Sequence, residues 1–447
     1  MNLLLEQVAL LCNGKLSCNS NKDLLITDVT ISSKDNGNNK LFIALKGNHV
    51  DGNNFIKDFI KNKSCAAITS LELSLPNLII VEDTLLALEL LAKNYHQLFN
   101  PKCVIITGSN GKTTVKNLIR NICVKEYGSD HVHATEGNYN NHIGLPLTLL
   151  GLNSDHKILI LEAGMNHAGE LDKLTKIAKP DIAIVINVFL THIAQFNDIN
   201  DIADAKFEIY NGLSEKGFAL INQKLSYADQ WASNLKKPTV VFYGNNHENS
   251  LCYIRSLNES GAVVSTAEGD INFKLKILGM HNYDNALAAI SVCLKLGCSL
   301  SSIKNGLEDY SGYKRRLELK IGYNNINIID DTYNSSLSSV LAAILSLKKF
   351  PKPHWAIIGD CLEVGKYEVE IHEKIADIAN ENDLDFLITY GQSTKYTHHK
   401  FHSKKKHFQS IDDIVKFCYD NLPINATVLV KGSNSMNLDL VVNKLVK

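Results

Sequence analysis

Apolar residues occur along this chain in short runs, separated by segments long enough to form helices. Between residues 102 and about 310 the runs are typical of buried strands, and they lie at 104–107, 158–162, 182–188, 218–221 and 239–243. Strands that alternate with helical segments are typical of a parallel sheet wrapped by helices. The pattern therefore predicts a central α/β domain built on a parallel sheet.

Similar patterns flank this region. Before it, strand-like runs lie at 41–45, 66–68 and 78–81, and an apolar helical segment follows at 84–98. Asn100-Pro101 then marks a break. After Arg316, strands are expected at 326–330, 354–359, 386–390 and 427–431, whereas Lys404-Lys405-Lys406 is expected to be a solvated surface turn. The patterns predict three α/β domains, at residues 1–98, 99–312 and 313–447.

Composition excludes several function classes for this 447-residue chain. Its 46 basic and 47 acidic residues create no net field that would attract nucleic acid or an anionic membrane. We expect no membrane span, because no run of about 18 uncharged apolar residues occurs, and no signal peptide, because the segment 1–6 lacks a basic start and contains Glu6. Ten cysteines are scattered without a Cys-x-x-Cys pair, which is typical of reduced, mostly buried thiols in a cytoplasmic protein.

The strongest chemical signal follows the apolar run at 104–107. There the chain breaks into Gly108-Ser109-Asn110-Gly111-Lys112-Thr113-Thr114 and then enters a helical segment at 115–123. A strand, a glycine turn and a helix in this order direct free backbone N–H groups at phosphate, while a lysine and a hydroxyl serve the outer phosphates and Mg²⁺. Only two residues separate the glycines, whereas the common P-loop has four. The segment predicts binding of a nucleoside triphosphate.

Polar residues near the ends of neighbouring strands extend this prediction. Glu162 closes the strand expected at 158–162, where a carboxylate could hold Mg²⁺ beside the Thr113 hydroxyl. His192 follows the run at 182–188 after a short loop. Taken alone, His192 fits a hydrogen-bonded structural histidine better than a ligand, and Lys206 fits a lysine on a helix surface.

Several segments together resemble the ATP-dependent Mur ligases of peptidoglycan synthesis. Besides the phosphate loop, the resemblance rests on Arg316, His372 and residues 135–149, 162–166, 187–192, 205–209, 279–285, 330–334, 359–363 and 431–433. It spans nearly the whole chain. Residues 135–149, 330–334 and 359–363 most resemble the members that act on UDP-N-acetylmuramoyl-tripeptide and D-alanyl-D-alanine.

The chain departs from the family pattern at three places. Ser32-Ser33-Lys34 stands where family members usually carry Asp-Ser-Arg, and a lysine lacks the planar fork of an arginine. Ser335-Ser336-Leu337 replaces residues like Ala-Asn-Pro, and Asn434 stands where an arginine often follows Lys-Gly-Ser. These departures concern substrate contacts.

The resemblance implies a fold and an activity. It implies an amino-terminal UDP-binding domain, a central P-loop ATPase domain and a carboxyl-terminal Rossmann-like domain, with closure when ligands bind. ATP would phosphorylate the terminal carboxylate of UDP-N-acetylmuramoyl-tripeptide, and the amine of D-alanyl-D-alanine would attack the acyl phosphate. The product would be the pentapeptide precursor of peptidoglycan, made in the bacterial cytoplasm by a monomeric enzyme.

The resemblance also implies roles for individual residues. Thr113 and Glu162 would hold one Mg²⁺, and Glu162, His192 and a carbamate on Lys206 would hold a second. Carbamylation needs an unprotonated amine, so Lys206 should be desolvated or close to other cations. ATP would contact Gly108, Ser109, Asn110, Gly111, Lys112, Thr113, Thr114, Asn282, Asn285, Arg316 and Asp331. The catalytic candidates are Lys112, Lys206, His192 and Glu162, and the substrate candidates are Ser33, Lys34, Lys46, Asn138, Asn140 and Asn141.

Three alternatives stay open from the sequence alone. The first is another Mur-type ligase, or a folylpolyglutamate-type ligase, that adds a single amino acid. The second is a P-loop ATPase switch, which would hydrolyse ATP without an acceptor. The third is an inactive binding module.

Overall fold

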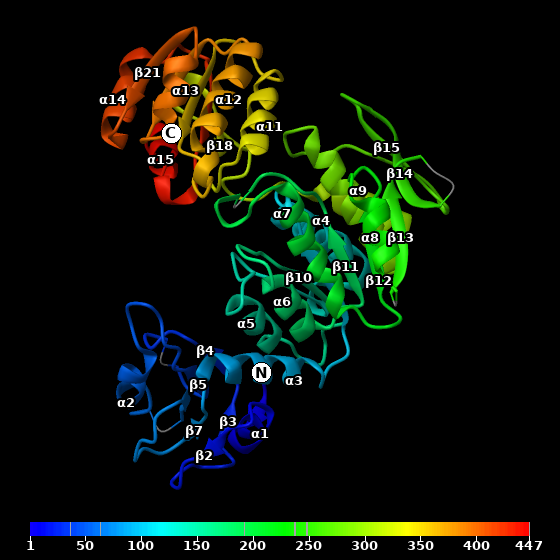
Figure 1. Ribbon diagram of the computed structural model, residues 1–447, viewed down its shortest axis with the longest axis vertical. Coiled ribbons are helices and arrows are strands. Elements are labelled where there is room, and N and C mark those ends of the chain that lie inside the picture. Colours follow the sequence, from blue (N-terminus) through cyan, green and yellow to red (C-terminus); the bar gives the residue numbers. More distant parts are fainter. Residues whose placement is uncertain (36, 63, 192, 237, 247–248, 447) are drawn as a thin grey trace.

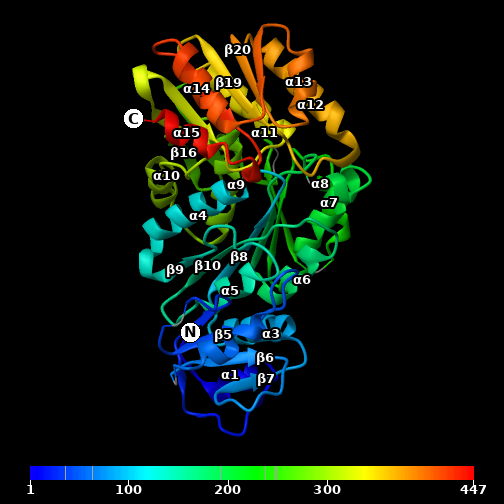
Figure 2. The ribbon, with the colours of Figure 1, turned by 90° about the vertical axis from the view of Figure 1, so that its left-hand side faces the viewer.

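Three large β-sheets, of five, nine and six strands, follow one another along the long axis of the molecule, and a two-stranded sheet accompanies the first. The structure is a computed structural model that describes residues 1–35, 37–62, 64–191, 193–236, 238–246 and 249–446. Figure 2 shows the amino-terminal sheet at one end, the largest sheet in the middle and the carboxyl-terminal sheet at the other end. Among the described residues, no helix has both the length and the apolar character that a bilayer span requires. The predicted α/β class is confirmed.

The middle sheet has nine strands in the order β16-β15-β14-β13-β12-β11-β8-β10-β9. The strands are β8 Lys102–Thr107, β9 Val132–Ala134, β10 Ile158–Glu162, β11 Ile182–Val185, β12 Phe218–Asn222, β13 Thr239–Gly244, β14 Ser250–Asn258, β15 Gly261–Thr266 and β16 Gly269–Phe273. β8 lies between β10 and β11 and runs parallel to both. β14, β15 and β16, which pair antiparallel, were not predicted from the sequence. Their apolar residues are mixed with exposed polar and charged ones, as in antiparallel strands with a solvated face, and so differ from the fully buried central strands.

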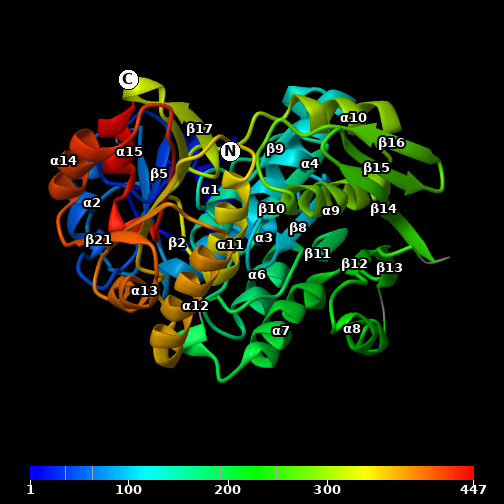
Figure 3. The same ribbon diagram turned by 90° about the horizontal axis from the view of Figure 1, so that it is seen from above.

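Helices cover both faces of the middle sheet. One face carries α4 Lys112–Tyr127, α9 His281–Lys295 and α10 Leu300–Asp309, and the other carries α5 Gly144–Leu150, α6 Glu170–Ala178, α7 Ile199–Phe207 and α8 Ala228–Asn234. Figure 3 shows α4, α9 and α10 on one side of the strands, with α6 and α7 on the other. Along β8, Cys103 and Ile105 join one apolar cluster and Val104 and Ile106 the other, as the two-residue period of a strand requires. The sheet is therefore buried on both faces.

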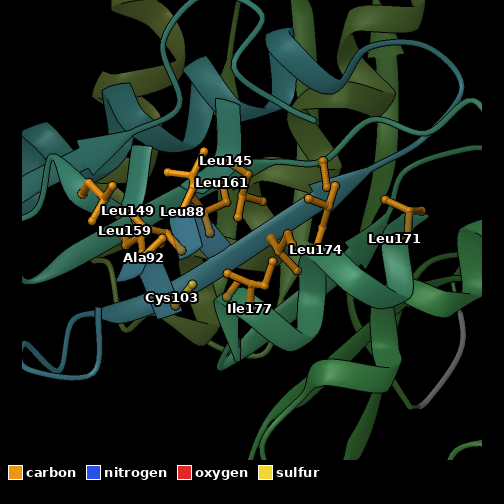
Figure 4. Packing of buried hydrophobic residues seen from close by; sticks show 14 of the residues in the cluster. Leu88, Ala92, Cys103, Leu145, Leu149, Leu159, Leu161, Leu171, Leu174 and Ile177 are labelled. Carbon is orange, nitrogen blue, oxygen red and sulfur yellow. The ribbon is translucent and has the colours of Figure 1, made fainter. Parts of the chain in front are cut away.

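The amino-terminal sheet has the order β2-β7-β6-β5-β4, and β1 pairs separately with β3. Its elements are β1 Leu3–Leu4, α1 Leu5–Leu11, β2 Lys15–Leu16, β3 Leu25–Ile26, β4 Asp28–Thr30, β5 Lys40–Ile43, α2 Ile56–Phe59, β6 Ala66–Thr69, β7 Leu78–Ile80 and α3 Thr84–His96. The helix α3 lies between this sheet and the middle one (Figure 1). Figure 4 shows Leu88 and Ala92 of α3 packed with Leu145, Leu149 and Cys103 of the middle region. One continuous apolar cluster therefore joins the two sheets.

The carboxyl-terminal sheet has the order β17-β18-β22-β19-β20-β21. Its elements are β17 Glu318–Ile321, β18 Asn327–Asp331, α11 Leu337–Leu347, β19 His354–Gly359, α12 Glu368–Glu381, β20 Phe386–Tyr390, α13 Thr394–Lys400, β21 Lys404–Phe408, α14 Ile411–Asn421, β22 Thr427–Lys431 and α15 Asp439–Leu445. The strands are parallel except β17, which pairs antiparallel with β18.

The predicted surface turn at Lys404-Lys405-Lys406 is wrong. These lysines begin β21, the edge strand that pairs in parallel with β20. Lys404 and Lys406 remain exposed. A lysine-rich edge strand resists further strand pairing, because its charges would have to be desolvated.

Two predicted boundaries also differ near the phosphate loop. The strand expected at 182–188 ends at Val185, because the next residues bind the loop: Ser109 N donates to Asn187 O at 3.1 Å and Phe189 N to Ser109 Oγ at 2.8 Å. The helix expected at 115–123 extends over Lys112–Tyr127. The phosphate loop is thus braced by the end of the neighbouring strand.

Candidate active site

The phosphate loop connects β8 to α4 at the middle of the sheet. Gly111 caps α4 with φ 83°, a left-handed conformation that favours glycine. A Cβ at Gly111 would lie 2.5 Å from Asn285 Oδ1, so no larger residue fits. The first-turn N–H groups of a helix have no partner within the helix, and here they lie at a cleft of about 1000 Å³. This is the geometry of an anion site.

The side chain of Lys112 folds back onto the phosphate loop. Its Nζ donates to Gly108 O at 2.8 Å and to Ser109 O at 3.3 Å. Both acceptors are neutral carbonyls of the loop, so an incoming phosphate would offer this ammonium a stronger, charged acceptor. Lys112 thus lies at the cleft, bound to the loop's own carbonyls.

Glu162 is the centre of a hydrogen-bond network at the end of β10. The residue is 3% exposed, and its Oε2 accepts from Thr113 Oγ1 at 3.0 Å. Its Oε1 accepts from Asn140 Nδ2 at 2.9 Å. The expected pair of Thr113 and Glu162 therefore meets, and Asn140 orients the carboxylate from the other side.

Lys116 supports this network, and the sequence analysis did not single it out. Its side chain is buried, and its Nζ donates to Thr135 O at 2.6 Å. The Thr135 hydroxyl in turn accepts from Glu162 N at 3.0 Å. Burial lowers the pKa of Lys116, and the nearby charge of Glu162 opposes this shift. The sequence signal that could have pointed to Lys116 is its position one helical turn after Lys112, among apolar residues.

Arg316 reaches the same point from the far side of the cleft. Its Nη2 donates to Thr113 Oγ1 at 3.2 Å, and its Cζ lies 4.1 Å from the centroid of the Tyr333 ring. The preceding Arg315 has φ 63° and turns the other way, donating to Thr332 O at 2.8 Å. The backbone turn at Arg315 therefore sends two consecutive arginines in different directions.

Asp331 also lies at this cleft, but it is already paired. Its Oδ2 accepts from Lys431 Nζ at 2.6 Å, and Lys431 is 1% exposed. Its Oδ1 accepts from Leu317 N at 3.2 Å. One oxygen of Asp331 thus binds a buried lysine while the other holds the backbone that follows Arg316.

Asn110 contacts the carboxyl-terminal region directly, which the sequence did not indicate. Its Nδ2 donates to Ser338 Oγ at 2.9 Å and to Ser336 Oγ at 3.3 Å. Ser336 is the amino-terminal cap of α11. The tip of the phosphate loop is therefore hydrogen-bonded to the start of a helix in another sheet region.

Lys206 is buried, so its interpretation as a helix-surface lysine is wrong. It lies on α7, is 2% exposed and lines the cleft. Burial lowers its pKa well below the ordinary value, and the charge of Lys112 lowers it further. Within the described ranges its Nζ has no hydrogen-bond or ion-pair partner. Desolvation and a nearby cation, the two conditions for an uncharged amine, are both present. His192 lies outside the described residues.

The remaining candidates fall into two groups. Asn282 and Asn285 lie in the first turns of α9 and line the cleft, and Asn285 Nδ2 donates to Asn282 Oδ1 at 2.8 Å. Asn141 also lines the cleft, whereas Asn138 is exposed outside it. Ser33, Lys34 and Lys46 are not among the cleft residues.

The last three candidates share one edge of the amino-terminal sheet. Ser33 and Lys34 follow β4, and Lys46 follows β5, which is its parallel neighbour. The carboxyl ends of parallel neighbours lie side by side. Lys34 and Lys46 are exposed there.

Family models match both regions that form the cleft. Residues 106–293 match the Mur ligase middle domain, and residues 315–434 match the Mur ligase, glutamate ligase domain. The chain belongs to the Mur ligase family.

Individual Mur ligases match over their full length. The UDP-N-acetylmuramoyl-tripeptide--D-alanyl-D-alanine ligase of Haemophilus influenzae is 32% identical, over 98% of this chain and 97% of the relative. The crystal structure of MurF from Acinetobacter baumannii has a TM-score of 0.91 and 28% identity, with 100% of this chain and 99% of that chain covered. The MurF ligase of Thermotoga maritima in complex with ADP has a TM-score of 0.84 and 25% identity, covering 95% and 98%.

Family membership decides between the classes of function that the sequence left open. The full-length match to Mur ligases favours a ligase over a P-loop switch or an inactive binding module. FolC of Escherichia coli, at 16% identity and a TM-score of 0.62, shares the fold.

Proposed function

We propose that this protein is an ATP-dependent, ADP-forming ligase that joins D-alanyl-D-alanine to the terminal carboxylate of UDP-N-acetylmuramoyl-tripeptide. The observation that carries the proposal is the network at Glu162, where a phosphate loop, a buried carboxylate and an arginine from another region converge. ATP and the UDP-linked tripeptide are substrates found in the cytoplasm, so we place the enzyme there. We also propose that it acts as a monomer. Its three parts would divide at 98/99 and 312/313.

The residues present fit ATP. The α4 amino terminus and Lys112 offer N–H donors and a cation to the phosphates, and the left-handed Gly111 lets the backbone approach closely. Arg316 and Asp331 would contact the ribose and phosphates. Asn282 and Asn285 would contact the adenine, since they open α9 directly above the loop.

The residues also fit Mg²⁺, which prefers oxygen ligands. Glu162 is a buried carboxylate, and its hydrogen-bond partners among the described residues, Thr113 and Asn140, are both neutral donors. A buried carboxylate without an ion-pair partner is costly, and a divalent cation would neutralise it. Bound Mg²⁺ supplies charge neutralisation for the phosphoryl group. Thr113 and Glu162 would hold one ion, and Glu162, His192 and Lys206 a second.

Lys206 would take part in the second metal site as a carbamate. Its uncharged amine would attack the carbon of CO₂, forming an N–C bond and releasing one proton to solvent. The product is an anion with two oxygens, which suits a hard cation. Burial and the Lys112 charge, which lower the pKa of Lys206, are the physical support for this step.

In the proposed reaction the tripeptide carboxylate takes the terminal phosphoryl group of ATP, and ADP leaves. The amine of D-alanyl-D-alanine then attacks the acyl carbon, the carbon–oxygen bond to phosphate breaks, and the nitrogen loses a proton. Lys112 and Arg316 would stabilise the charge on the transferred group, because both face Thr113 or the loop. Closure of the cleft would exclude water from the acyl phosphate.

The first substrate would bridge two regions. Ser33, Lys34 and Lys46 would bind the UDP part, and the asparagines Asn138, Asn140 and Asn141 would contact the peptide part near Glu162. The exposed lysines at the ends of β4 and β5 support a diphosphate partner.

Phosphate release tests the proposal. The enzyme is assayed with ATP, each of the lysine- and diaminopimelate-containing UDP-tripeptides, and either D-alanyl-D-alanine or single amino acids. We expect release only with a UDP-tripeptide and the dipeptide together. Release without either acceptor would indicate an ATPase switch, and turnover with a single amino acid but not the dipeptide would indicate a different ligase.

A further inference from the structure

Three buried cysteines from distant parts of the sequence meet beneath α4. Cys123 lies on α4, Cys293 on α9 and Cys298 just before α10, and their sulfur atoms all lie within 4.8 Å of one another. Their exposures are 0%, 0% and 2%. In the described part of the chain no other three histidine, cysteine or carboxylate side chains gather so closely. The three thiols are free and buried, as expected, and although they are scattered in the sequence they lie together in the fold.

The backbone fixes the three sulfurs in place. After α9 the chain reverses at Gly297, which has φ 80°, and Cys298 N donates to Cys293 O at 2.9 Å. This reversal is the common helix ending that needs a left-handed glycine, and it folds Cys298 back onto Cys293. Tyr127 Oη, in the last turn of α4, donates to Leu296 O at 2.7 Å. This hydrogen bond attaches α4, which carries Cys123, to the turn that follows α9.

A second tie holds the start of α10. Glu126, also on α4, accepts from Ser299 N at 3.0 Å and from Ser299 Oγ at 2.8 Å. Ser299 is the residue directly after Cys298 and caps α10. The cluster is therefore built on backbone that is already ordered, so a ligand would gain its contacts at a small cost in conformational entropy.

The chemistry of the cluster favours one class of ligand. Its three candidate ligand atoms are sulfur and lie within one apolar cluster, and thiolate sulfur binds soft or borderline ions in preference to a hard cation such as Mg²⁺. An isolated buried cysteine is a small apolar residue, and Cys252 in the same apolar cluster is of that kind.

We propose that Cys123, Cys293 and Cys298 together bind one soft, thiophilic metal ion of the Cu(I) or Zn²⁺ class. Binding replaces thiol protons with metal–sulfur bonds, and the protons pass to solvent. The site lies eleven residues along α4 from Lys112, or about 16 Å at the helical rise per residue. It is therefore a structural site that ties α4, α9 and α10 together, separate from the cleft and independent of the proposed function.

Metal retention tests the proposal. Reduced full-length protein is incubated under anaerobic conditions with Cu(I) or with Zn²⁺ in separate samples, desalted in the presence of a competing chelator, and analysed for metal by mass spectrometry. The same is done for Cys298→Ala and Cys123→Ala, with Cys252→Ala as the matched buried control and Cys18→Ala as the exposed control. The Tm of each metal-free variant shows whether it folds.

We expect about one equivalent of one of the two metals in the unsubstituted protein and in both controls, with loss of at least about tenfold in affinity in Cys298→Ala. The metal-loaded protein should also have a higher Tm than the metal-free protein, since a ligand bound only to the folded state stabilises it. No retained metal, or equal retention by folded Cys298→Ala, would overturn the proposal. X-ray absorption that finds oxygen or nitrogen neighbours in place of sulfur would do the same.

Discussion

The two ends of α4 carry opposite kinds of chemistry. At its start, Lys112 and Thr113 face an open cleft with a carboxylate and an arginine beside them. Near its end, Cys123 meets two other sulfurs inside an apolar cluster. The start of α4 thus supports a polar site suited to phosphate and hard cations, and its end supports a buried sulfur site suited to soft ions. Burial and the type of ligand atom, rather than the helix that carries them, therefore decide the chemistry of each end.

The largest predicted effect concerns the polar end. Lys206→Ala should lower kcat by about 10³-fold, because it removes a ligand of the proposed second metal site, and added formate or acetate should restore part of the rate. Lys176→Ala, which removes an exposed lysine paired with Asp172, is the matched control. Steady-state phosphate release measures both variants. Unchanged turnover in Lys206→Ala would reject the role.

The pH dependence of carbamate formation should follow the lowered pKa of Lys206. Only the neutral amine reacts, so reactivation of CO₂-stripped enzyme by bicarbonate should fall as the pH decreases through that pKa, and should level off well below the ordinary value of 10.5. The rate of reactivation at constant dissolved CO₂ is the measurement. A rate that keeps rising up to the ordinary lysine pKa would show that Lys206 is not the group.

A smaller loss of activity is predicted for a change at Lys116, one turn after Lys112 on α4. Lys116→Met removes the donor to Thr135 O and should lower kcat/KM by about tenfold, mainly through a higher Mg²⁺ requirement, since Thr135 positions Glu162. Lys125→Met changes an exposed lysine on the same helix and serves as the control. Mg²⁺ titrations of the rate compare the variants. Equal Mg²⁺ dependence in the two would contradict the positioning role.

The contact across the cleft should contribute less. Ser338→Ala and Asn110→Ala each remove part of a neutral hydrogen bond, worth about 1 kcal/mol or about fivefold in KM for ATP. Because the two residues share one contact, the double variant should lose less than the sum of the two single losses. Additive losses in this double-mutant cycle would mean that the contact plays no part in closing the cleft.

The smallest effect on activity is predicted for the cysteine cluster near the end of α4. Cys298→Ala should leave kcat within about twofold, because the cluster lies about 16 Å along α4 from Lys112. The activity of metal-free enzyme under reducing conditions is the readout. A large loss in a variant with an unchanged Tm would mean that the two ends of α4 are coupled.

The polar end was predictable because its residues are consecutive. The order of strand, glycine turn and helix places Lys112 and Thr113 without any knowledge of distant contacts. In the same way, the apolar run that ends in Glu162 places its carboxylate at the end of a strand. The apolar strands of the three sheets were predicted for the same local reason. Polar strands such as β21 were not, because strand pairing there depends on the neighbouring backbone and leaves no apolar run.

The rest of the site depends on residues far apart in sequence. Ser338 meets Asn110 across 228 positions, and Cys123 meets Cys293 and Cys298 only after three helices pack. Lys206 was misjudged in isolation because a helix pattern gives no warning that its polar position faces a cleft instead of solvent. Packing, which no local pattern encodes, supplied these contacts.

We expect Glu162, which ends β10 beside the start of α4, to hold a divalent cation for a bound nucleotide. The most direct test is Mn²⁺ binding in the presence of ADP, followed by electron paramagnetic resonance, in the unsubstituted protein, in Glu162→Gln and in the exposed control Glu136→Gln. We predict tight Mn²⁺ binding in the first and last proteins, and an affinity at least about tenfold weaker in Glu162→Gln. Equal Mn²⁺ affinity in all three proteins would show that Glu162 is not a metal ligand.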